Sequence, residues 1–246
     1  MNFENINIVL VNTNHSGNIG GAARAMKNMG LTRLTLVAPR DYPAPEATWR
    51  AASAADVIQS AKVVDSLEDA ISDSQFVVGT SARGRRIPWP IEDARVCAER
   101  IAENSSFERI SILFGREDRG LLNEELQCCN LHCHIPTHDG YPSLNLAMAV
   151  QVVAYELRMA ALAGTATSPK YASWDTPFAT VKEMTHFYRH LEETLIEIGF
   201  LKEEAPRKLM TRLTRLYNRV RLDEMELNIL RGILTETQKT SRRHKG

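Results

Sequence analysis

The 246-residue chain lacks the segments that mark membrane and secreted proteins. It has no run of about 18 apolar residues and no charged start followed by an apolar segment. Its four cysteines (Cys97, Cys128, Cys129 and Cys133) fit a reducing compartment better than a disulfide framework. We therefore expect a cytoplasmic protein with no membrane association.

The cysteines also lack the arrangement of a structural metal site. Three of them lie near His132, His134 and His138, which makes zinc binding one interpretation. Structural zinc sites usually combine two ligand pairs with C-x₂₋₄-C-type spacing, and the sequence lacks this combination. The segment 131–136 is better interpreted as a short strand, and we predict no metal.

The chain as a whole has no excess of positive or negative charge. The 30 basic and 30 acidic side chains give a formal net charge of zero. Residues 1–164 carry 15 basic and 19 acidic side chains, whereas residues 165–246 carry 15 and 11. The even total therefore hides a basic C-terminal part, which is compatible with binding an acidic partner.

The motifs of the common nucleotide and hydrolase folds are absent too. The glycines at 17–21 do not have the G-x-G-x-x-G spacing of a dinucleotide fold, and there is no G-x-x-x-x-G-K-[ST] phosphate loop. Thr80-Ser81-Ala82 is not the G-x-S-x-G turn of a hydrolase. These absences remove most of the support for a dehydrogenase, kinase or hydrolase.

Short apolar runs alternate with helix-forming segments over residues 1–164. The expected strands are 6–11, 31–37, 63–64, 76–80, 110–114 and 131–135, and the expected helices are 22–29, 46–53, 66–72, 92–103, 124–129 (capped by Asn123) and 143–163. This alternation predicts an α/β fold, a parallel sheet with helices on both faces. Residues 165–176 are interpreted as a linker. An all-helical extension over 177–246 follows, with helices at about 177–198, 205–220 and 223–238 and a basic, disordered tail from Ser241.

Three motifs come directly after strands, where open α/β folds collect their ligand-binding loops. They are Asn18–Arg24, Leu113–Leu121, and Ile135-Pro136 with Ser143–Ala147. In the first, a loop over 12–21 would let Gly20 and Gly21 approach a ligand closely. Arg24, in the first turn of the following helix, suits a phosphate or a hydroxyl. A surface salt bridge is the alternative for Arg24.

The other strand ends carry similar residue types. Arg83, Arg85 and Arg86 stand before Trp89, a combination typical of phosphate contact and base stacking, although a solvated loop with a packed tryptophan also explains it. Gly115 leaves room for a ligand. Ser143 and Asn145 begin a long helix whose free N–H groups can meet a ligand, or the two residues simply cap that helix.

Together the motifs resemble the SPOUT class of S-adenosylmethionine-dependent RNA methyltransferases, in its TrmH-like branch. The matching segments are N-x-G-x-x-A-R at 18–24, F-G-R-E at 114–117 and S-L-N-L-A at 143–147. Segments 79–83, 121–126 and 227–234 make the chain similar to bacterial enzymes that methylate the ribose of cytidine or uridine at nucleotide 32 of tRNA. Asp118 departs from this pattern, where a less acidic residue is expected.

The resemblance implies a deep trefoil knot and a homodimer whose active sites form across the subunit interface. It assigns the cofactor S-adenosylmethionine to Thr80, Ser81, Ala82, Gly115, Ile135, Ser143, Leu144 and Asn145. It assigns the catalytic site to Arg24, Ser143, Asn145, Arg116 and Glu117. Arg24 would orient the ribose near the partner's cofactor, while Arg116 and Glu117 fix the active-site loop.

The basic extension is expected to bind tRNA. Arg207, Lys208, Arg212, Arg215, Arg219 and Arg221 fall within 15 residues with no acid between them. Arg83, Arg85 and Arg86 are further RNA-binding candidates. A solvated helix surface is the alternative for the run itself. For the whole chain the alternatives are methylation of another tRNA position or of ribosomal RNA, and a non-catalytic RNA-binding protein.

Overall fold

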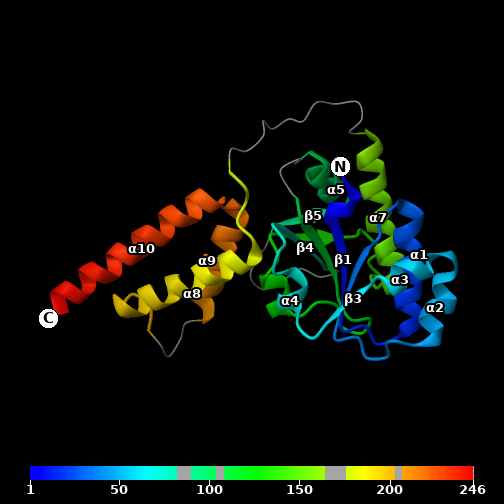
Figure 1. Ribbon diagram of the computed structural model, residues 1–246, viewed down its shortest axis with the longest axis horizontal. Helices are drawn as coiled ribbons and strands as arrows, with labels where there is room; N and C mark the ends of the chain where they lie inside the picture. Colours follow the sequence, from blue (N-terminus) through cyan, green and yellow to red (C-terminus); the bar gives the residue numbers. More distant parts are fainter. Residues whose placement is uncertain (82–89, 104–107, 164–175, 203–206, 246) are drawn as a thin grey trace. The chain divides into compact units, whose positions relative to one another are not determined.

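A computed structural model describes residues 1–81, 90–103, 108–163, 176–202 and 207–245 (Figure 1). The chain divides into two compact units, Met1–Ser173 and Trp174–Gly246. The predicted linker over 165–176 lies almost entirely outside the described residues. Each unit is described by itself.

The first unit is built on a seven-stranded sheet in which every described pairing is parallel. The strand order is β3-β2-β1-β6-β4-β7-β5. The strands are β1 (Ile6–Val11), β2 (Arg33–Val37), β3 (Lys62–Val64), β4 (Phe76–Thr80), β5 (Ile91–Asp93), β6 (Ile110–Phe114) and β7 (Leu131–His134). β1 and β6 are buried along their whole length, as expected for central parallel strands covered on both faces.

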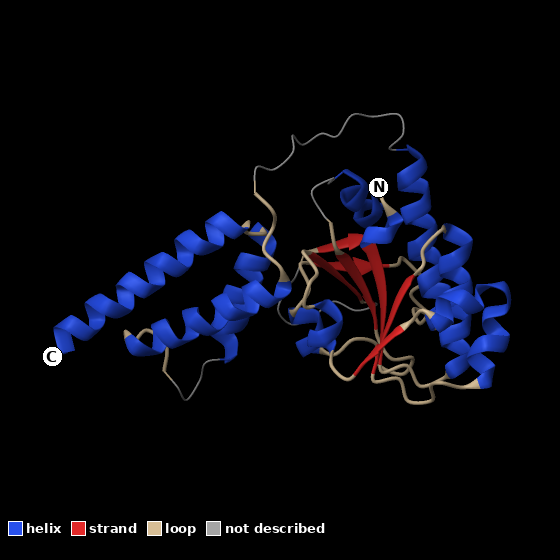
Figure 2. Cartoon of the chain, viewed as in Figure 1, coloured by secondary structure: helices blue, strands red, loops and turns tan. Residues whose placement is uncertain are grey.

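Helices cover both faces of this sheet (Figure 2). They are α1 (Ser16–Met29), α2 (Pro45–Ala51), α3 (Ala55–Gln59), α4 (Leu67–Ile71), α5 (Ala94–Glu103), α6 (Asn123–Gln127) and α7 (Leu146–Ala163), with short 3₁₀ turns at Phe3–Asn5 and Ala52–Ala54. α7 packs between α1 and α5, while α4 lies on the opposite side of the sheet (Figure 1). The predicted α/β class is confirmed.

The glycine-rich segment 17–21 is not a loop, as the sequence was taken to indicate, but part of α1. A Cβ at Gly20 would stand 2.2 Å from the carbonyl oxygen of Ala47 in α2, and one at Gly21 would stand 2.9 Å from Cβ of Ala147 in α7. These glycines therefore serve close helix packing. The helix begins six residues earlier than expected because packing overrides the poor helix propensity of glycine.

Other boundaries differ for local reasons. β5 was missed because residues 92–93 were assigned to the helix predicted over 92–103, and the short α3 lies within residues 54–62, for which no element was predicted. α7 begins at Leu146, so Ser143 does not start it. Asn123 is the first residue of α6 and not its cap, since the Leu122 N–H donates to the Glu125 carboxylate at the preceding position.

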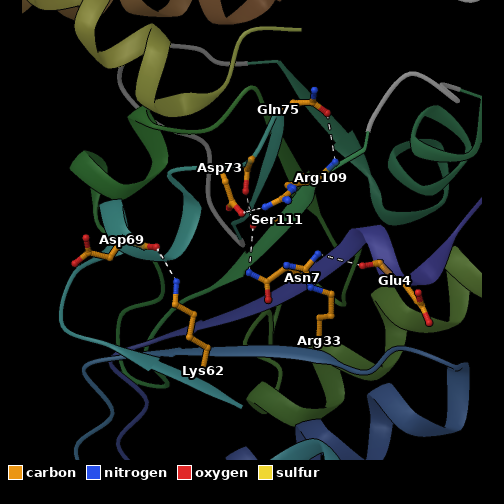
Figure 3. Close-up of polar contacts among 10 residues, drawn as sticks. Glu4, Asn7, Arg33, Lys62, Asp69, Asp73, Gln75, Arg109 and Ser111 are labelled. Atoms are coloured by element: carbon orange, nitrogen blue, oxygen red, sulfur yellow. Dashed lines mark hydrogen bonds and ion pairs between the residues drawn. The ribbon is translucent and has the colours of Figure 1, made fainter. Parts of the chain in front are cut away.

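A polar cluster lies at the amino ends of the central strands (Figure 3). Asn7 accepts a hydrogen bond from Thr35 at 3.0 Å and donates to the Ser111 hydroxyl at 3.4 Å, and Ser111 bonds Ser74 at 2.8 Å. Arg109 pairs with Asp73 beside them. The buried members satisfy one another, so we interpret this cluster as structural.

The second unit consists of α8 (Val181–Glu197), α9 (Arg207–Val220) and α10 (Glu224–Lys245). Phe187, Leu191 and Leu227 lie in its core, against which Leu213 and Tyr217 of α9 pack. Thr180 caps α8 by accepting from the Glu183 N–H at 3.3 Å. The predicted disordered tail is wrong for 241–245, because α10 continues through Lys245.

α7 is long and apolar enough to span a membrane, with a mean hydropathy of 1.4. Core helices of proteins outside membranes meet the same criterion. Within α7, Glu156 forms an ion pair with Arg95 of α5, with 3.3 Å between Oε2 and Nε. The helix packs on α1 and α5, which leave part of its apolar surface exposed.

Candidate functional site

A pocket lies at the carboxyl ends of β4, β6 and β7, where the predicted motif segments meet. It is lined by Thr80, Ser81, Phe114, Gly115, Arg116, Glu117, Asp118, Arg119, Gly120, Leu121, Cys133, Ile135, Pro142, Ser143, Leu144, Leu146 and Ala149. Six of the predicted cofactor residues (Thr80, Ser81, Gly115, Ile135, Ser143 and Leu144) are among them. Ala82 lies outside the described residues, as do Arg83, Arg85 and Arg86.

Backbone and hydroxyl contacts fix the strand ends that open into this pocket. The Thr80 hydroxyl donates to the Leu113 carbonyl at 2.8 Å, which ties β4 to β6. The Ser81 N–H donates to the Cys133 carbonyl at 2.9 Å, which ties β4 to β7. The floor of the pocket is therefore part of the rigid sheet.

Gly115 is required by the turn that follows it. A Cβ there would lie 2.1 Å from the backbone carbon of Gly120 and from the Leu121 nitrogen. The turn is closed by the Gly120 N–H donating to the Arg116 carbonyl at 2.8 Å, and Gly120 has a φ of 68°. The sequence predicted room for a ligand at Gly115, whereas the structure places the chain's own backbone there.

Arg116 holds this turn against the rest of the unit. Its guanidinium bonds both carboxylate oxygens of Glu125 in α6, at 3.0 and 2.9 Å, and it also donates to the Asn12 side chain. The two paired side chains are only 16% and 13% exposed. A bidentate, nearly buried pair of this kind is rigid, so Arg116 holds the turn against α6.

Glu117 joins the turn to the start of α1. Its carboxylate accepts from the backbone N–H groups of Asn14 and His15, at 3.0 and 3.3 Å, and from the Asn18 side chain at 2.8 Å. Partial burial acts to raise the pKa of Glu117, but these donors outweigh it and lower the pKa below its ordinary value. Glu117 is therefore a carboxylate at neutral pH.

The chain of hydrogen bonds continues to the third motif. The Asn145 amide donates to the Asn18 side-chain oxygen at 2.9 Å, while its own oxygen accepts from the Ala147 N–H at 3.0 Å in the first turn of α7. Asn145 is thus a helix cap as well as a link to α1, and it does not line the pocket. Asn18 was quoted in the first motif, but its connecting role could not be read without its partners.

Arg24 is exposed on α1 and does not line the pocket. It lies one turn beyond Gly20 and Gly21, the positions where α1 meets α2 and α7. Of the five predicted catalytic residues, the structure places Arg116, Glu117 and Ser143 around the pocket and Asn145 beside it.

The basic residues of α9 are displayed on its outer side. Lys208, Arg212 and Arg219 are exposed and Arg215 is half-buried, while Leu213 and Tyr217 face the core. Arg207 is the first residue of the helix, and its side chain lies outside the described residues. Arg221 instead stacks on Phe178, with its guanidinium carbon 5.2 Å from the ring centroid.

The remaining sequence candidates have ordinary surroundings. Asp118, the departure from the motif, lines the pocket and pairs with Arg119 at 2.9 Å, which lowers the pKa of Asp118. The four cysteines are free, and burial raises the pKa of the Cys129 thiol well above its ordinary value. Among the described residues, no group of three His, Cys, Asp or Glu side chains is placed to hold a metal ion.

Comparison with known proteins covers nearly the whole chain. Residues 5–155 match the SpoU rRNA methylase family, and residues 182–246 match the C-terminal domain of tRNA methyltransferase TrmJ. The chain is 52% identical to the tRNA (cytidine/uridine/adenosine-2′-O-)-methyltransferase TrmJ of Pseudomonas aeruginosa, covering 97% of this chain and 96% of that one. It is 48% identical to the Escherichia coli tRNA (cytidine/uridine-2′-O-)-methyltransferase TrmJ, covering 98% of each.

Solved structures agree with these sequence matches. TrmJ from Z. mobilis superposes with a TM-score of 0.80 at 32% identity, covering 94% of this chain and 97% of that one. The SpoU methyltransferase AviRb from Streptomyces viridochromogenes, in complex with the cofactor AdoMet, gives a TM-score of 0.51 at 20% identity over 65% of this chain and 62% of that one. The latter likeness concerns the fold.

Proposed function

This chain belongs to the SpoU rRNA methylase family, and we propose that it methylates the ribose 2′-hydroxyl of cytidine or uridine at nucleotide 32 of tRNA. The observation that carries the proposal is that the predicted strand ends and the second and third motif segments line one pocket. The TrmJ C-terminal domain favours tRNA over ribosomal RNA as the substrate.

S-adenosylmethionine is the cofactor that the pocket suits. Phe114, Leu121 and Leu144 supply apolar walls for an adenine ring, while the hydroxyls of Thr80, Ser81 and Ser143 supply polar contacts. We assign its binding to these hydroxyls, to Gly115, Ile135 and Leu144, to Ala82, and to Asn145 at the edge. When bound, it supplies an electrophilic methyl group on a positively charged sulfur. The trefoil knot of the family is inferred for the same part of the chain.

Arg24 is proposed to orient the acceptor ribose and the adjacent phosphate. Because the unperturbed pKa of arginine exceeds about 12, it is a poor general base. Its planar guanidinium can instead donate two hydrogen bonds to the phosphate or stabilise charge that develops on the 2′-oxygen. Ser143 lines the pocket and would contact the nucleophile or the methionine end of the cofactor.

A homodimer explains why Arg24 lies outside the pocket of its own chain. α7 presents an exposed apolar stripe formed by Met148, Tyr155, Met159 and Leu162, whose spacing places them on one helix face. We propose that a second copy covers this stripe and that Arg24 of each subunit serves the pocket of the other. Such a protein would act in the cytosol, beside its tRNA substrate.

Mixing two inactive variants tests the shared site. Arg24→Ala and Ser143→Ala subunits, unfolded together and refolded, should regain about a quarter of wild-type activity, since half of the dimers are mixed and each mixed dimer has one intact site. Either variant refolded alone is the control and should stay inactive. No recovery in the mixture would place Arg24 and Ser143 in the same subunit's site.

The reaction itself is tested with labelled S-adenosylmethionine and unmodified tRNA transcripts. Alkaline cleavage requires a free 2′-hydroxyl, so a methylated nucleotide leaves a gap in the ladder. A gap at nucleotide 32 that disappears with Arg24→Ala is the expected result. A gap elsewhere would mean that another nucleotide of tRNA is the target. Transfer to ribosomal RNA alone would mean that ribosomal RNA, and not tRNA, is the substrate. Absence of transfer to any RNA would favour a non-catalytic binder.

A further inference from the structure

Tyr141 lies beside the pocket with its ring in solvent. Pro142, directly after it, and Ile135, six residues before it, both line the pocket, whereas Tyr141 is 78% exposed. Among the described residues, its hydroxyl makes no hydrogen bond. Neither core packing nor a polar contact with the described residues accounts for a large aromatic side chain at the rim.

The backbone under this ring is nevertheless well defined. The Tyr141 N–H donates to the His138 carbonyl at 2.9 Å, and the Gly140 N–H donates to the His138 ring at 3.1 Å. The Thr137 hydroxyl donates to the Pro142 carbonyl at 3.4 Å, across the base of the loop. Pro142 further restricts Tyr141 to an extended conformation. The ring is therefore carried on a fixed turn.

We propose that Tyr141 is the stacking platform for the base of the target nucleotide, an inference that rests on the proposed function. The atom that is methylated belongs to the ribose, so the ribose must reach the mouth of the pocket while its base remains outside. An exposed aromatic ring on the rim lies where that base would project. Its flat face matches the flat face of a base that has left the stack of the anticodon loop.

Stacking also fits the proposed choice of substrates. Cytidine and uridine differ in the donors and acceptors of their Watson–Crick edges, but both have a π-face. A site that read the edge by hydrogen bonds would discriminate between them, whereas stacking on an aromatic side chain tolerates either. Arg119, which also lines the pocket, is already paired with Asp118, whereas Tyr141 presents an exposed aromatic ring at the rim.

Three single variants test the platform. Tyr141→Ala should lower kcat/KM for tRNA by about 5- to 100-fold, the range observed when a stacking residue is truncated. Tyr141→Phe should stay within about twofold of the wild type, because the ring remains. Trp49→Ala is the matched control, since Trp49 is 76% exposed on α2, outside the pocket lining, and its loss should change nothing.

A fluorescent base at nucleotide 32 reports stacking directly. Pyrrolocytidine at that position should be quenched on binding to the wild type and to Tyr141→Phe, but not to Tyr141→Ala. Calorimetry should give all three proteins the same affinity for S-adenosylmethionine, because the variants leave the pocket interior unchanged. This measurement also verifies that each variant is folded.

Four outcomes overturn the platform while leaving the proposed function standing. They are full activity of Tyr141→Ala, equal quenching by Tyr141→Ala, a loss in Tyr141→Phe as large as in Tyr141→Ala, and a loss confined to cofactor affinity. If the wild type left nucleotide 32 unmethylated, the proposed function itself would fail, and the platform with it.

Discussion

Glu117 connects two motif segments through a single carboxylate, and its ionisation therefore matters for the site. Its pKa is lowered in the folded protein, below the value of about 4.3 expected in the unfolded chain. A group of this kind stabilises the fold at pH values above its unfolded pKa. That contribution is lost as the pH falls through the lower, folded pKa.

Glu117→Gln should therefore destabilise the protein at neutral pH but not in acid. We expect a loss of about 1–2 kcal/mol at pH 7, because three donors lose a charged acceptor. The midpoint of thermal unfolding, measured from pH 7 down to pH 3, should differ between wild type and variant by a few degrees at pH 7 and converge below the carboxyl range. Asp65→Asn, at an exposed carboxylate away from this turn, should show no such difference. A constant gap at every pH would contradict the charge-based explanation.

Arg24 is the second residue on which a prediction rests. Arg24→Ala should reduce kcat by about 10²–10³-fold, the usual loss when one donor to a developing oxyanion is removed. The affinity for S-adenosylmethionine should not change, since Arg24 is assigned to the acceptor ribose and phosphate and not to the cofactor. Methyl-transfer kinetics with Arg33→Ala, at the amino end of β2, provide the control. Near wild-type turnover by Arg24→Lys would show that the planar fork is unnecessary.

At the scale of secondary-structure elements, the helix packing around α1 depends on glycine. Gly20→Ala should lower the stability of the first unit by about 1–3 kcal/mol, because its Cβ would collide with the backbone of α2. Gly232→Ala in α10 is the matched helical control. Nothing lies within 4 Å of a Cβ there, so alanine should stabilise the second unit by about 0.5–1 kcal/mol. Differential scanning calorimetry measures both changes, and a neutral Gly20→Ala would refute the packing argument.

The elements that sequence predicted well are those whose burial is decided locally. β1, β4 and β6 have their predicted bounds because apolar, β-branched runs in the middle of a parallel sheet are buried on both faces. The start of α1 was misplaced because residues 17–21 are helical only through contacts with α2 and α7. Similarly, the first residue of α7 depends on the cap that Asn145 provides, together with its bond to Asn18.

At the scale of the whole molecule, charge is concentrated on α9 and should control affinity for tRNA. Replacing Lys208, Arg212 and Arg219 together by Gln should weaken binding at moderate salt. It should also lower the magnitude of the slope of log K against log salt by about 2–3, since each neutralised phosphate contributes about 0.7–0.9. Filter binding over a salt series measures the slope.

The control for this experiment removes the same charge elsewhere. Arg33, Lys62 and Arg109 lie at the amino ends of the strands (Figure 3), and their joint replacement by Gln should leave the slope unchanged. An equal drop for both triple variants would mean that net charge, and not the α9 surface, governs binding. An unchanged slope for the α9 variant would mean that the basic face of α9 is a solvated surface that does not contact tRNA.

The sequence by itself determined the parallel α/β class, the helical extension, and the residue types of the motif segments. Periodicity, composition and short motifs are local properties of the chain, so they can be read directly from its sequence. Only the tertiary structure decided that Glu117 contacts Asn18, that Gly115 accommodates Gly120, and that Tyr141 is left on the rim. Each of these contacts or exposures depends on how separate segments pack, and no pattern along the chain specifies it.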